Sequence, residues 1–346
     1  MGIEDEVRVQ CANPDCRVAQ DGRCIEGFAD LASCTHYGKA LVIVEHPKLA
    51  SAASTAPGTR LPSAKALARV DAQVVLRDKA CNVISIIGPF DSGKTSLIAG
   101  TYDLFQRGPV GGFAFAGSST LHSFERACHD TRRASQRKHA GMERTQTGDA
   151  TYFHLDLVKT GCQGKRTALM ANRSGEDYME AQSDPELAND FVELHLADIV
   201  TVLADGERLL DSGLRHQVRD DICLTLRAFQ EAGATRTSQR LAVVLTKLDA
   251  VREDGAKSER TIRFFESIVE DVRNQFSKHF MDICSFQVAA SPRSSGTQRG
   301  EGMVNLLDYW MSEPGRLSLV PVPQEEPEAN RAFGRLRPLA MRERDE

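Results

Sequence analysis

Beyond about residue 67, the hydrophobic positions form short uninterrupted runs that are separated by amphipathic stretches. Apolar runs of five or six residues that are rich in Val and Ile are typical of strands buried on both faces of a parallel sheet. Two further runs flank a segment with Gly161 and Gly164, which favours an antiparallel hairpin. The predicted strands are 82–87, 199–203, 241–245 and 283–288, and those of the hairpin are 151–158 and 166–171.

Helices are predicted between these strands. In the stretch 214–231, apolar residues recur every three or four positions, as on one face of a helix. Similar patterns predict helices at 258–279 and 303–311. Strands that alternate with helices predict an α/β fold, with helices on both faces of a mostly parallel sheet that contains one antiparallel strand.

The chain divides by composition into four parts. Residues 1–46 are rich in Cys, and 47–66 are rich in Ala, Ser and Pro, as a linker would be. The α/β domain is predicted at 67–313. The last segment, 314–346, carries Pro, Glu and Arg with little apolar periodicity, so we expect a loosely ordered tail.

Composition and charge exclude some classes of protein. With 346 residues, 41% hydrophobic content and a net charge of -5, the chain has no general attraction for nucleic acid, and none is indicated as a partner. No segment has the roughly 18 uncharged apolar residues needed to span a membrane. The acidic start MGIEDEVRVQ is unlike a secretory signal, so a cytoplasmic location is expected.

The segment GPFDSGKT, residues 88–95, directly follows the first predicted strand and precedes a helical pattern. In the pattern G-x-x-x-x-G-K-[ST], backbone N–H groups and the helix N-terminus cradle phosphates, the Lys neutralises their charge, and the Ser or Thr hydroxyl binds Mg²⁺. This predicts one site for a nucleoside triphosphate with Mg²⁺, in which Lys94 is also a catalytic candidate. The predicted binding residues are Gly88, Pro89, Phe90, Asp91, Ser92, Gly93, Lys94, Thr95 and Ser96.

A second motif favours guanine as the base. Thr246, Lys247 and Asp249 follow the 241–245 strand, at the strand end where ligands of open α/β sheets bind. The Asp can accept the N1–H and 2-amino protons of guanine, which adenine cannot offer, while the Lys stem lies along the base. The small-residue turn with Ala289 and Ala290 is predicted to offer backbone N–H groups to guanine O6.

The run Asn172-Arg173-Ser174-Gly175-Glu176 stands where GTPases carry D-x-x-G. Asn172 keeps an oxygen ligand for Mg²⁺ but lacks the negative charge of the usual Asp, which predicts a weakened metal site. Gly175 can still turn its N–H to the γ-phosphate. Glu176 is predicted to position the attacking water; the alternative is that Glu176 and Asp177 only cap the following helix.

The first switch is less clearly marked. A Thr ahead of the hairpin is expected to meet the γ-phosphate and Mg²⁺, and Thr145 and Thr147 are the candidates. The stretch 122–138 is predicted to be an amphipathic insertion. Its basic residues are either a solvated face or a source of one arginine for the transition state: Arg126, Arg132, Arg133, Arg137 and Lys138.

Four cysteines crowd the first tenth of the chain, in a segment too small to build its own core. Thiolates at such a density in a reducing compartment indicate a structural Zn²⁺ site, and the alternative is four unligated cysteines packed against the rest of the protein. The predicted ligands are Cys11, Cys16, Cys24 and Cys34, with His36 as an alternative.

In their order, the segments GPFDSGKT, NRSGED, LADG, TKLD and VAASPR, behind a Cys-rich head, resemble the bacterial double-GTPase family, second type. These are P-loop GTPases of the translation-factor-related class, and the resemblance covers nearly all of 1–312. It implies a three-layer P-loop GTPase-like fold, GTP and Mg²⁺ as ligands, and a second GTPase or other proteins of bacterial conflict systems as partners. Asn172 departs from the family pattern and puts efficient hydrolysis in doubt.

Three hypotheses about function follow. The first is a GTPase that is slow or regulated by a partner and acts as a switch in a conflict or defence system. The second is a GTP-binding switch that does not hydrolyse its nucleotide, because Asn172 leaves GTP intact. The third is an ATP-driven signalling module, in which Asp249 plays no part in choosing the base.

Overall fold

We describe the protein from a computed structural model. The described residues are 11, 16, 18, 24, 27–34, 36–38, 65–131, 147–161, 164–293 and 296–312. The chain forms two compact units, Met1–Met311 and Ser312–Glu346, and Ser312 is the one described residue of the second. The positions of Thr145 and of Arg132, Arg133, Arg137 and Lys138 lie outside the described residues, as does the predicted tail 314–346.

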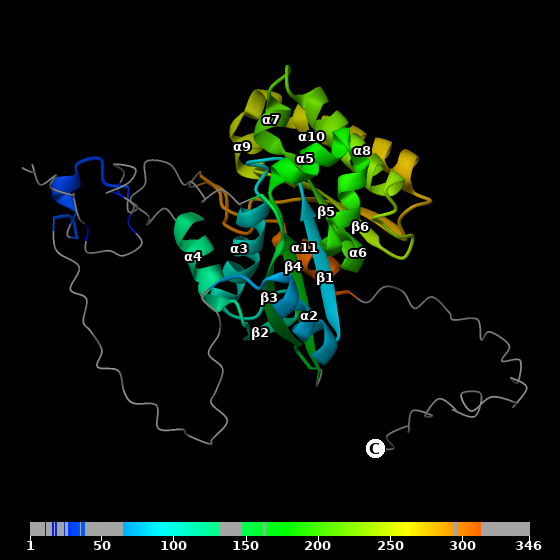
Figure 1. Cartoon of the computed structure of the whole chain (residues 1–346). Helices are drawn as coiled ribbons and strands as arrows, with labels where there is room; N and C mark the ends of the chain where they lie inside the picture. Colours follow the sequence, from blue (N-terminus) through cyan, green and yellow to red (C-terminus); the bar gives the residue numbers. More distant parts are fainter. Residues whose placement is uncertain are drawn as a thin grey trace, which may run out of the picture. The chain divides into compact units, whose positions relative to one another are not determined.

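A seven-stranded sheet in the order β2-β3-β4-β1-β5-β6-β7 forms the centre of the described fold (Figure 1). All neighbouring strands pair in parallel except at β3, which runs antiparallel to both β2 and β4. The carboxyl ends of β1, β5, β6 and β7 therefore share one edge of the sheet. The strands are β1 (Cys81–Ile87), β2 (Phe113–Gly117), β3 (Thr151–Lys159), β4 (Lys165–Asn172), β5 (Ile199–Asp205), β6 (Arg240–Thr246) and β7 (Asp282–Gln287).

Helices cover both faces of this sheet (Figure 1). The α-helices are α2 (Arg69–Asp78), α3 (Lys94–Leu104), α4 (Leu121–Thr131), α5 (Gly175–Ser183), α6 (Val192–Leu196), α7 (Gly206–Leu210), α8 (Arg215–Glu231), α9 (Leu248–Glu253), α10 (Gly255–Phe276) and α11 (Met303–Met311). Short 3₁₀ helices lie at Leu31–Ser33, Phe105–Arg107 and Pro185–Asp190.

Alternation along β1 shows how the two layers of core arise. Ile84 and Ile86 point into the cluster formed with α3, α4 and α11. Val83 packs on the opposite face with residues of α2, and Ile87 on that face with residues of α5, α8 and α10. Because successive side chains of a strand alternate between faces, a run without polar interruption is what a sheet covered on both sides requires.

The structure confirms the predicted fold class and every predicted strand, with boundaries that shift by one or two residues. The predicted helices are α8, α10 and α11, and the predicted insertion contains α4, of which Arg126 is an exposed residue. The elements that were not predicted include β2, α2 and the short helices α6, α7 and α9. Strand β2 extends the sheet beyond the hairpin, and α2 covers β3 and β4 from a region with only three apolar residues on its buried side.

In the described part of the Cys-rich head, Cys11 pairs with Tyr37 as an isolated antiparallel bridge. A 3₁₀ turn at Leu31–Ser33 is capped by Asp30, whose carboxylate accepts from the Ala32 backbone N–H at 3.1 Å. Cys11 and Cys34 are buried. These contacts all lie within the Cys-rich head.

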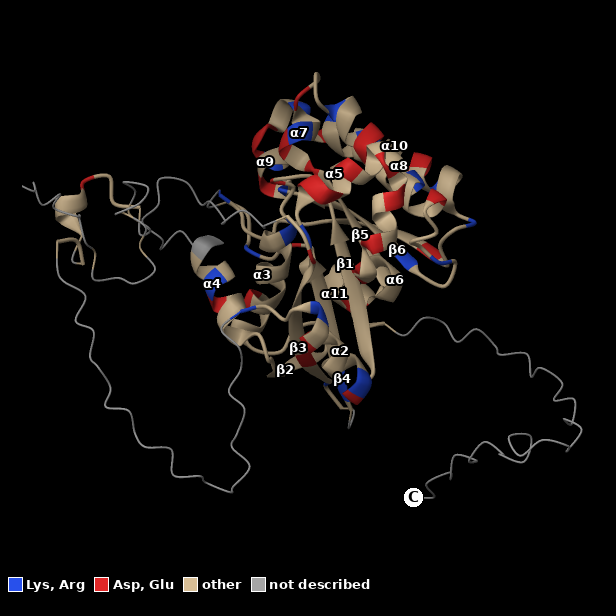
Figure 2. Ribbon diagram, viewed as in Figure 1, with Lys and Arg blue, Asp and Glu red and all other residues tan. Residues whose placement is uncertain are grey.

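None of the helices in the described residues has the length and apolar character that a membrane crossing demands. In Figure 2, acidic and basic residues are interspersed along α8 and α10. Because positive and negative residues are mixed along α8 and α10, neither helix presents a surface of one charge sign.

The single Trp of the chain tests the packing of α11 on the sheet. Trp310 is 1% exposed, and its Nε1 donates to Thr201 Oγ1 at 3.0 Å. We predict that Trp310→Phe lowers the free energy of unfolding by about 1–3 kcal/mol, because it removes volume and leaves the buried hydroxyl without its donor. Urea unfolding followed by circular dichroism measures this change.

The matched control is Val70→Ala, since Val70 is apolar but 72% exposed on α2. We expect that change to alter stability by less than about 0.5 kcal/mol. Equal unfolding midpoints for the Trp310→Phe variant and the unmodified protein would show that α11 does not contribute to the core as described.

Candidate functional site

The loop 88–95 connects β1 to α3 at the carboxyl edge of the sheet. Gly93 has a φ of +93° and Asp91 a φ of +59°, so the loop contains two left-handed residues. Ser92 Oγ donates to the Pro89 carbonyl at 2.8 Å, which closes the turn. Left-handed residues turn successive N–H groups inward, which is the geometry of a phosphate-binding concavity.

Lys94, the first residue of α3, lies across its own loop. Its Nζ donates to the carbonyl oxygens of Gly88 at 2.8 Å and Pro89 at 2.9 Å. Burial lowers the pKa of Lys94 to about 8, while the Asp91 and Asp177 carboxylates act in the opposite direction. A desolvated ammonium gains more from an anionic phosphate than an exposed one does, so this lysine suits phosphate binding.

The base motif and the phosphate loop meet directly. Thr246 is the last residue of β6, and its Oγ1 donates to the backbone carbonyl of Ser92 at 2.8 Å. This bond joins segments 154 residues apart in the sequence. The structure thus brings together GPFDSGKT and TKLD, which the sequence predicted to share one site.

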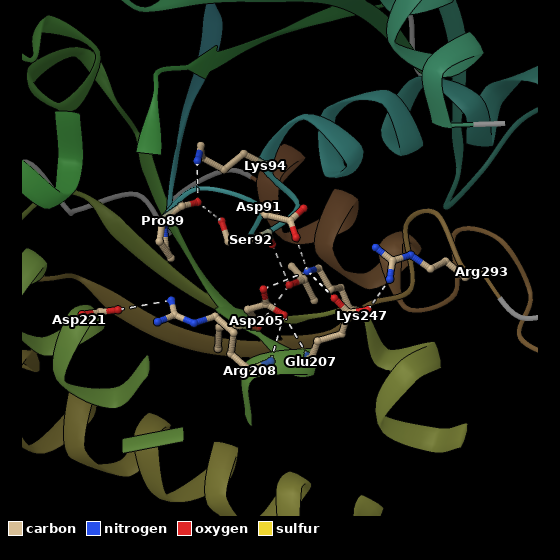
Figure 3. Close-up of polar contacts among 12 residues, drawn as sticks. Pro89, Asp91, Ser92, Lys94, Asp205, Glu207, Arg208, Asp221, Lys247 and Arg293 are labelled. Carbon is tan, nitrogen blue, oxygen red and sulfur yellow. Dashed lines mark hydrogen bonds and ion pairs between the residues drawn. The ribbon is translucent and has the colours of Figure 1, made fainter. Parts of the chain in front are cut away.

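Lys247 occupies the centre of a cluster of charges (Figure 3). Its Nζ lies 2.7 Å from Glu207 Oε2, 3.0 Å from Asp205 Oδ2 and 3.2 Å from Asp91 Oδ2. Burial acts to lower the pKa of Lys247, but Asp205 and the bonded carboxylates outweigh it and raise that pKa. For Asp205, which is only 3% exposed, burial dominates and raises its pKa. Lys247 is therefore held charged against the phosphate loop.

Asp249 lies in the first turn of α9 and is buried. Its Oδ2 accepts the backbone N–H of Arg293 at 2.8 Å. Arg293 Nη1 in turn donates to Glu207 Oε1 at 2.7 Å. The sequence interpretation of Asp205 as a structural residue fits its two bonds to the N–H groups that begin α7, but its contact with Lys247, and Glu207 and Arg293 altogether, were missed.

The small-residue turn after β7 holds the remaining predicted base contacts. Ala289 donates its N–H to the Glu301 carbonyl at 3.0 Å and accepts the Gly300 N–H at 2.9 Å. Its backbone groups are thus engaged within the protein. Ala290, the other residue predicted to contact guanine O6, follows it in the turn and is buried.

The segment that replaces D-x-x-G also reaches the phosphate loop. Asn172, the last residue of β4, donates from Nδ2 to Thr95 Oγ1 at 3.3 Å. Gly175 begins α5, and a Cβ added to it would lie 2.4 Å from the Phe90 backbone N and the Pro89 carbonyl carbon. Only glycine permits this approach, so the start of α5 packs directly against the backbone of the phosphate loop.

Glu176 is exposed in the first turn of α5. The cap of that helix is Ser174, whose Oγ accepts the Glu176 N–H at 3.4 Å. Asp177 accepts the Gly148 N–H at 3.1 Å and so ties the start of α5 to the segment before β3. Thr147, the described candidate for the first switch, is exposed beside this anchored glycine.

Arg173 was not singled out by the sequence, yet it forms the most buried ion pair at the site. Its Nε and Nη2 donate to the two carboxylate oxygens of Glu193, at 2.5 and 3.1 Å, and its Cζ lies 4.4 Å from the Phe191 ring centroid. Its Nη1 donates to the Gly148 carbonyl. Burial opposes the charge of Arg173, but Glu193 outweighs it and raises the pKa. No local pattern connects residues 148, 173 and 193, so this contact could not be predicted from the sequence.

The metal predictions have different outcomes. Asn172 and Thr95 are neighbours, as a shared Mg²⁺ site requires. Among the described residues, which include the four head cysteines and His36, no group of three or more His, Cys, Asp or Glu side chains is placed to hold a metal ion. The Zn²⁺ site at Cys11, Cys16, Cys24 and Cys34 stays a prediction.

A glycine-rich loop between a buried strand and a helix, with a Thr-Lys-x-Asp segment bonded to it, defines a P-loop nucleotide-binding protein. The model of the Double-GTPase 2 family matches residues 82–311. The chain belongs to this family and is a GTP-binding protein. No curated protein matches the sequence significantly.

Solved structures show weak similarity. The signal recognition particle receptor SRb-GTP/SRX complex from Chaetomium thermophilum aligns at 14% identity and a TM-score of 0.35, over 67% of this chain and 97% of that one. The Methanosarcina barkeri Roco2 RocCORdC bound to GDP aligns at 12% and 0.31, over 66% and 48%. Sup35 complexed with GDP aligns at 16% and 0.30, over 66% and 45%. The chain spans about half the length of the last two, and likenesses at this level do not establish a shared ligand.

The close approach of α5 to the phosphate loop generates a prediction. Gly175→Ala places a methyl group 2.4 Å from loop backbone and must displace either α5 or the loop. We expect nucleotide affinity to fall by about tenfold or more, since about 1.4 kcal/mol of lost binding free energy suffices for that. Titration with a fluorescent GTP analogue measures it.

Gly255→Ala is the matched control, because Gly255 also begins a helix but a Cβ there meets nothing within 4 Å. That variant should bind nucleotide like the unmodified protein. Unchanged affinity in the Gly175→Ala variant would mean that the contact between α5 and the loop is irrelevant to binding.

Proposed function

We propose that the protein binds GTP with Mg²⁺ and hydrolyses it slowly or under the control of a partner, as a molecular switch. The observation that carries this proposal is the meeting of Gly88–Thr95, Thr246–Asp249 and Asn172 at one edge of the sheet. Family membership supports it.

The phosphates are assigned to the loop before α3. The N–H groups of 88–95 and the N-terminus of α3 would bind phosphate oxygens, and Lys94 would exchange its two carbonyl partners for the β- and γ-oxygens. Gly175 lies against the same loop, so its N–H is in reach of a γ-phosphate bound there. A signal that depends on the γ-phosphate would thus pass into α5.

Guanine is assigned to Asp249 and Lys247. The Asp249 carboxylate already accepts one N–H from Arg293, through Oδ2, and a carboxylate has capacity for further bonds. Those would come from N1–H and the 2-amino group of guanine. Adenine has no such donor pair, and an Asp facing it would stay partly unsatisfied, which costs affinity.

The residues that would hold Mg²⁺ are Thr95 and Asn172, with Thr147 from the first switch. Hydroxyl and amide oxygens suit a hard cation, but none carries the charge of a carboxylate, so the phosphates themselves would hold the ion. When bound, Mg²⁺ supplies charge compensation for the β- and γ-oxygens. Asn172 therefore supports a slow or partner-dependent turnover.

For hydrolysis, Glu176 is the proposed residue that positions water. It is exposed one residue beyond Gly175, and the helix cap is provided by Ser174 rather than by Glu176. A carboxylate there can accept a proton from a water bonded to it, which orients an oxygen lone pair toward the γ-phosphorus. The basic stretch that contains Arg126 remains a proposed source of a transition-state arginine.

A second function, a GTP-binding switch without hydrolysis, is favoured by the same Asn172. In that case the nucleotide sets only the affinity for a partner. The family resemblance supports a second GTPase or other conflict-system proteins as that partner, a role in bacterial defence and a cytoplasmic location. The ATP-driven module is the least supported hypothesis, because Asp249 would then be buried at the site without a role in choosing the base.

Guanine preference is tested by Asp249→Asn. The amide still accepts the Arg293 N–H but loses the charge that two guanine donors require. We predict that GTP affinity falls by about 2–4 kcal/mol, roughly 30- to 1000-fold, and that ATP binding does not change. Calorimetric titration with each nucleotide measures both.

Asp254→Asn is the control, since Asp254 caps the neighbouring helix α10 and Asn also caps helices well. A clear preference of the unmodified protein for ATP, or a loss of ATP and GTP binding together in Asp249→Asn, would reject the guanine assignment.

Turnover is tested by Asn172→Asp. The substitution replaces the amide that donates to Thr95 Oγ1 with a carboxylate, which would accept from the Thr95 hydroxyl and adds a charge beside the proposed Mg²⁺ position. We predict a lower Mg²⁺ concentration at half-maximal rate and hydrolysis at least about tenfold faster, which corresponds to about 1.4 kcal/mol in the barrier. Phosphate release measured across a Mg²⁺ titration checks both. A switch that leaves GTP intact because of Asn172 predicts instead that the unmodified protein releases no phosphate at any Mg²⁺ concentration.

A further inference from the structure

Glu207 links two loops that lie on either side of the proposed base site. Its Oε2 lies 2.7 Å from Lys247 Nζ, and its Oε1 accepts from Arg293 Nη1 at 2.7 Å. Lys247 follows β6 and Arg293 lies beyond β7. Figure 3 shows the carboxylate of Glu207 between these two side chains. One carboxylate therefore uses both oxygens to hold the two loops.

The backbone of Glu207 is fixed as firmly as its side chain. Asp205 Oδ1 accepts the Glu207 N–H at 2.9 Å and so caps α7. A Cβ on Gly206 would lie 2.4 Å from the Thr246 carbonyl oxygen, so only glycine lets α7 begin this close to the end of β6. These contacts hold the backbone at the start of α7 in place, and Glu207 projects from it.

Glu207 holds two basic residues that belong to the segments proposed to bind the base. Lys247 has a φ of +52°, a left-handed conformation that a side chain adopts at a cost, and its ammonium is anchored between the phosphate loop and Glu207. Arg293 bonds Asp249 through its backbone N–H. The chain Glu207, Arg293, Asp249 thus leads from α7 to the carboxylate proposed to recognise guanine.

We propose that Glu207 is a positioning residue for guanine: by clamping Lys247 and Arg293 it fixes the orientation of Asp249 toward the 2-amino group of the base. This inference rests on the proposed GTP-binding function. Glu207 is not a catalytic residue, since it acts through Arg293 and Lys247. The alternative is that Glu207 and Arg293 form only a solvent-exposed ion pair, since their side chains are 33% and 63% exposed. Exposed ion pairs contribute little to stability.

The 2-amino group offers a direct readout. ITP has the N1–H and the O6 of GTP but lacks the 2-amino group, so the ratio of GTP to ITP affinity reports the alignment of Asp249. Inorganic tripolyphosphate reports the phosphate loop alone. A loss of packing would weaken all three ligands together, whereas a loss of base positioning weakens GTP most.

The test compares Glu207→Gln with the unmodified full chain. The amide keeps the size of the side chain but removes the charge that bonds two cations at once. We expect GTP affinity to fall about tenfold, the GTP-to-ITP ratio to shrink and tripolyphosphate binding to stay unchanged. Competition against a fluorescent GTP analogue gives all three dissociation constants.

Asp271→Asn is the matched control. Asp271 lies on α10, forms an ion pair with Arg219 of α8 at 2.8 Å, and has a side chain 28% exposed, much like Glu207. It should change none of the three dissociation constants. Equal thermal unfolding midpoints of both variants exclude a general loss of fold.

The possible results distinguish a failure of the role proposed for Glu207 from a failure of the proposed GTP-binding function. If the unmodified protein shows no preference for GTP over ATP, the proposed function fails and the role of Glu207 fails with it. If it prefers GTP and Glu207→Gln keeps both the affinity and the GTP-to-ITP ratio, only the role of Glu207 is overturned. An equal loss for GTP, ITP and tripolyphosphate overturns it as well.

Discussion

The site depends on how closely backbone segments approach one another at the carboxyl edge of the sheet. A Cβ at Gly175 would meet the phosphate loop at 2.4 Å, and one at Gly206 would meet the end of β6 at the same distance. Thr246 Oγ1 adds a bond to the loop carbonyl of Ser92. Helices α5 and α7 therefore rest with their N-termini on the two motifs, and any displacement at the phosphates moves backbone rather than a flexible side chain.

Two lysines at this edge have opposite electrostatic environments. Burial dominates at Lys94 and lowers its pKa to about 8, whereas three carboxylates around Lys247 raise its pKa. Lys94 is thus a charge that still gains from an anion, and Lys247 is a charge already compensated by the protein. The first suits a phosphate ligand, and the second suits a structural role beside a neutral base.

The fold was predictable because its strands are buried on both faces and so appear as uninterrupted apolar runs. The short edge strand β2 and the helix α2 were not predicted. Three of the five residues of β2 (FAFAG) are Gly or Ala, and the sequence of α2 is polar on average. At the site, the motif segments have fixed local spacing, so their pattern could be recognised in the sequence. Three contacts were missed because only the folded sheet edge brings their partners together. Glu207 lies 86 residues from Arg293 and 40 from Lys247, and Arg173 lies 20 residues from Glu193.

The contacts of Arg173 connect the two segments that sense the γ-phosphate in the proposed function. Arg173 lies between Asn172, which bonds Thr95, and Ser174, which caps α5. Its guanidinium bonds Gly148, next to Thr147, and is held by the buried Glu193. Removing one member of a buried pair costs about 3–5 kcal/mol, so Arg173 cannot leave Glu193 easily. Arg173 Nη1 also lies 3.4 Å from Asp177 in the first turn of α5, so Gly148 and the start of α5 share the guanidinium of Arg173 as a common contact that the buried Glu193 holds in place.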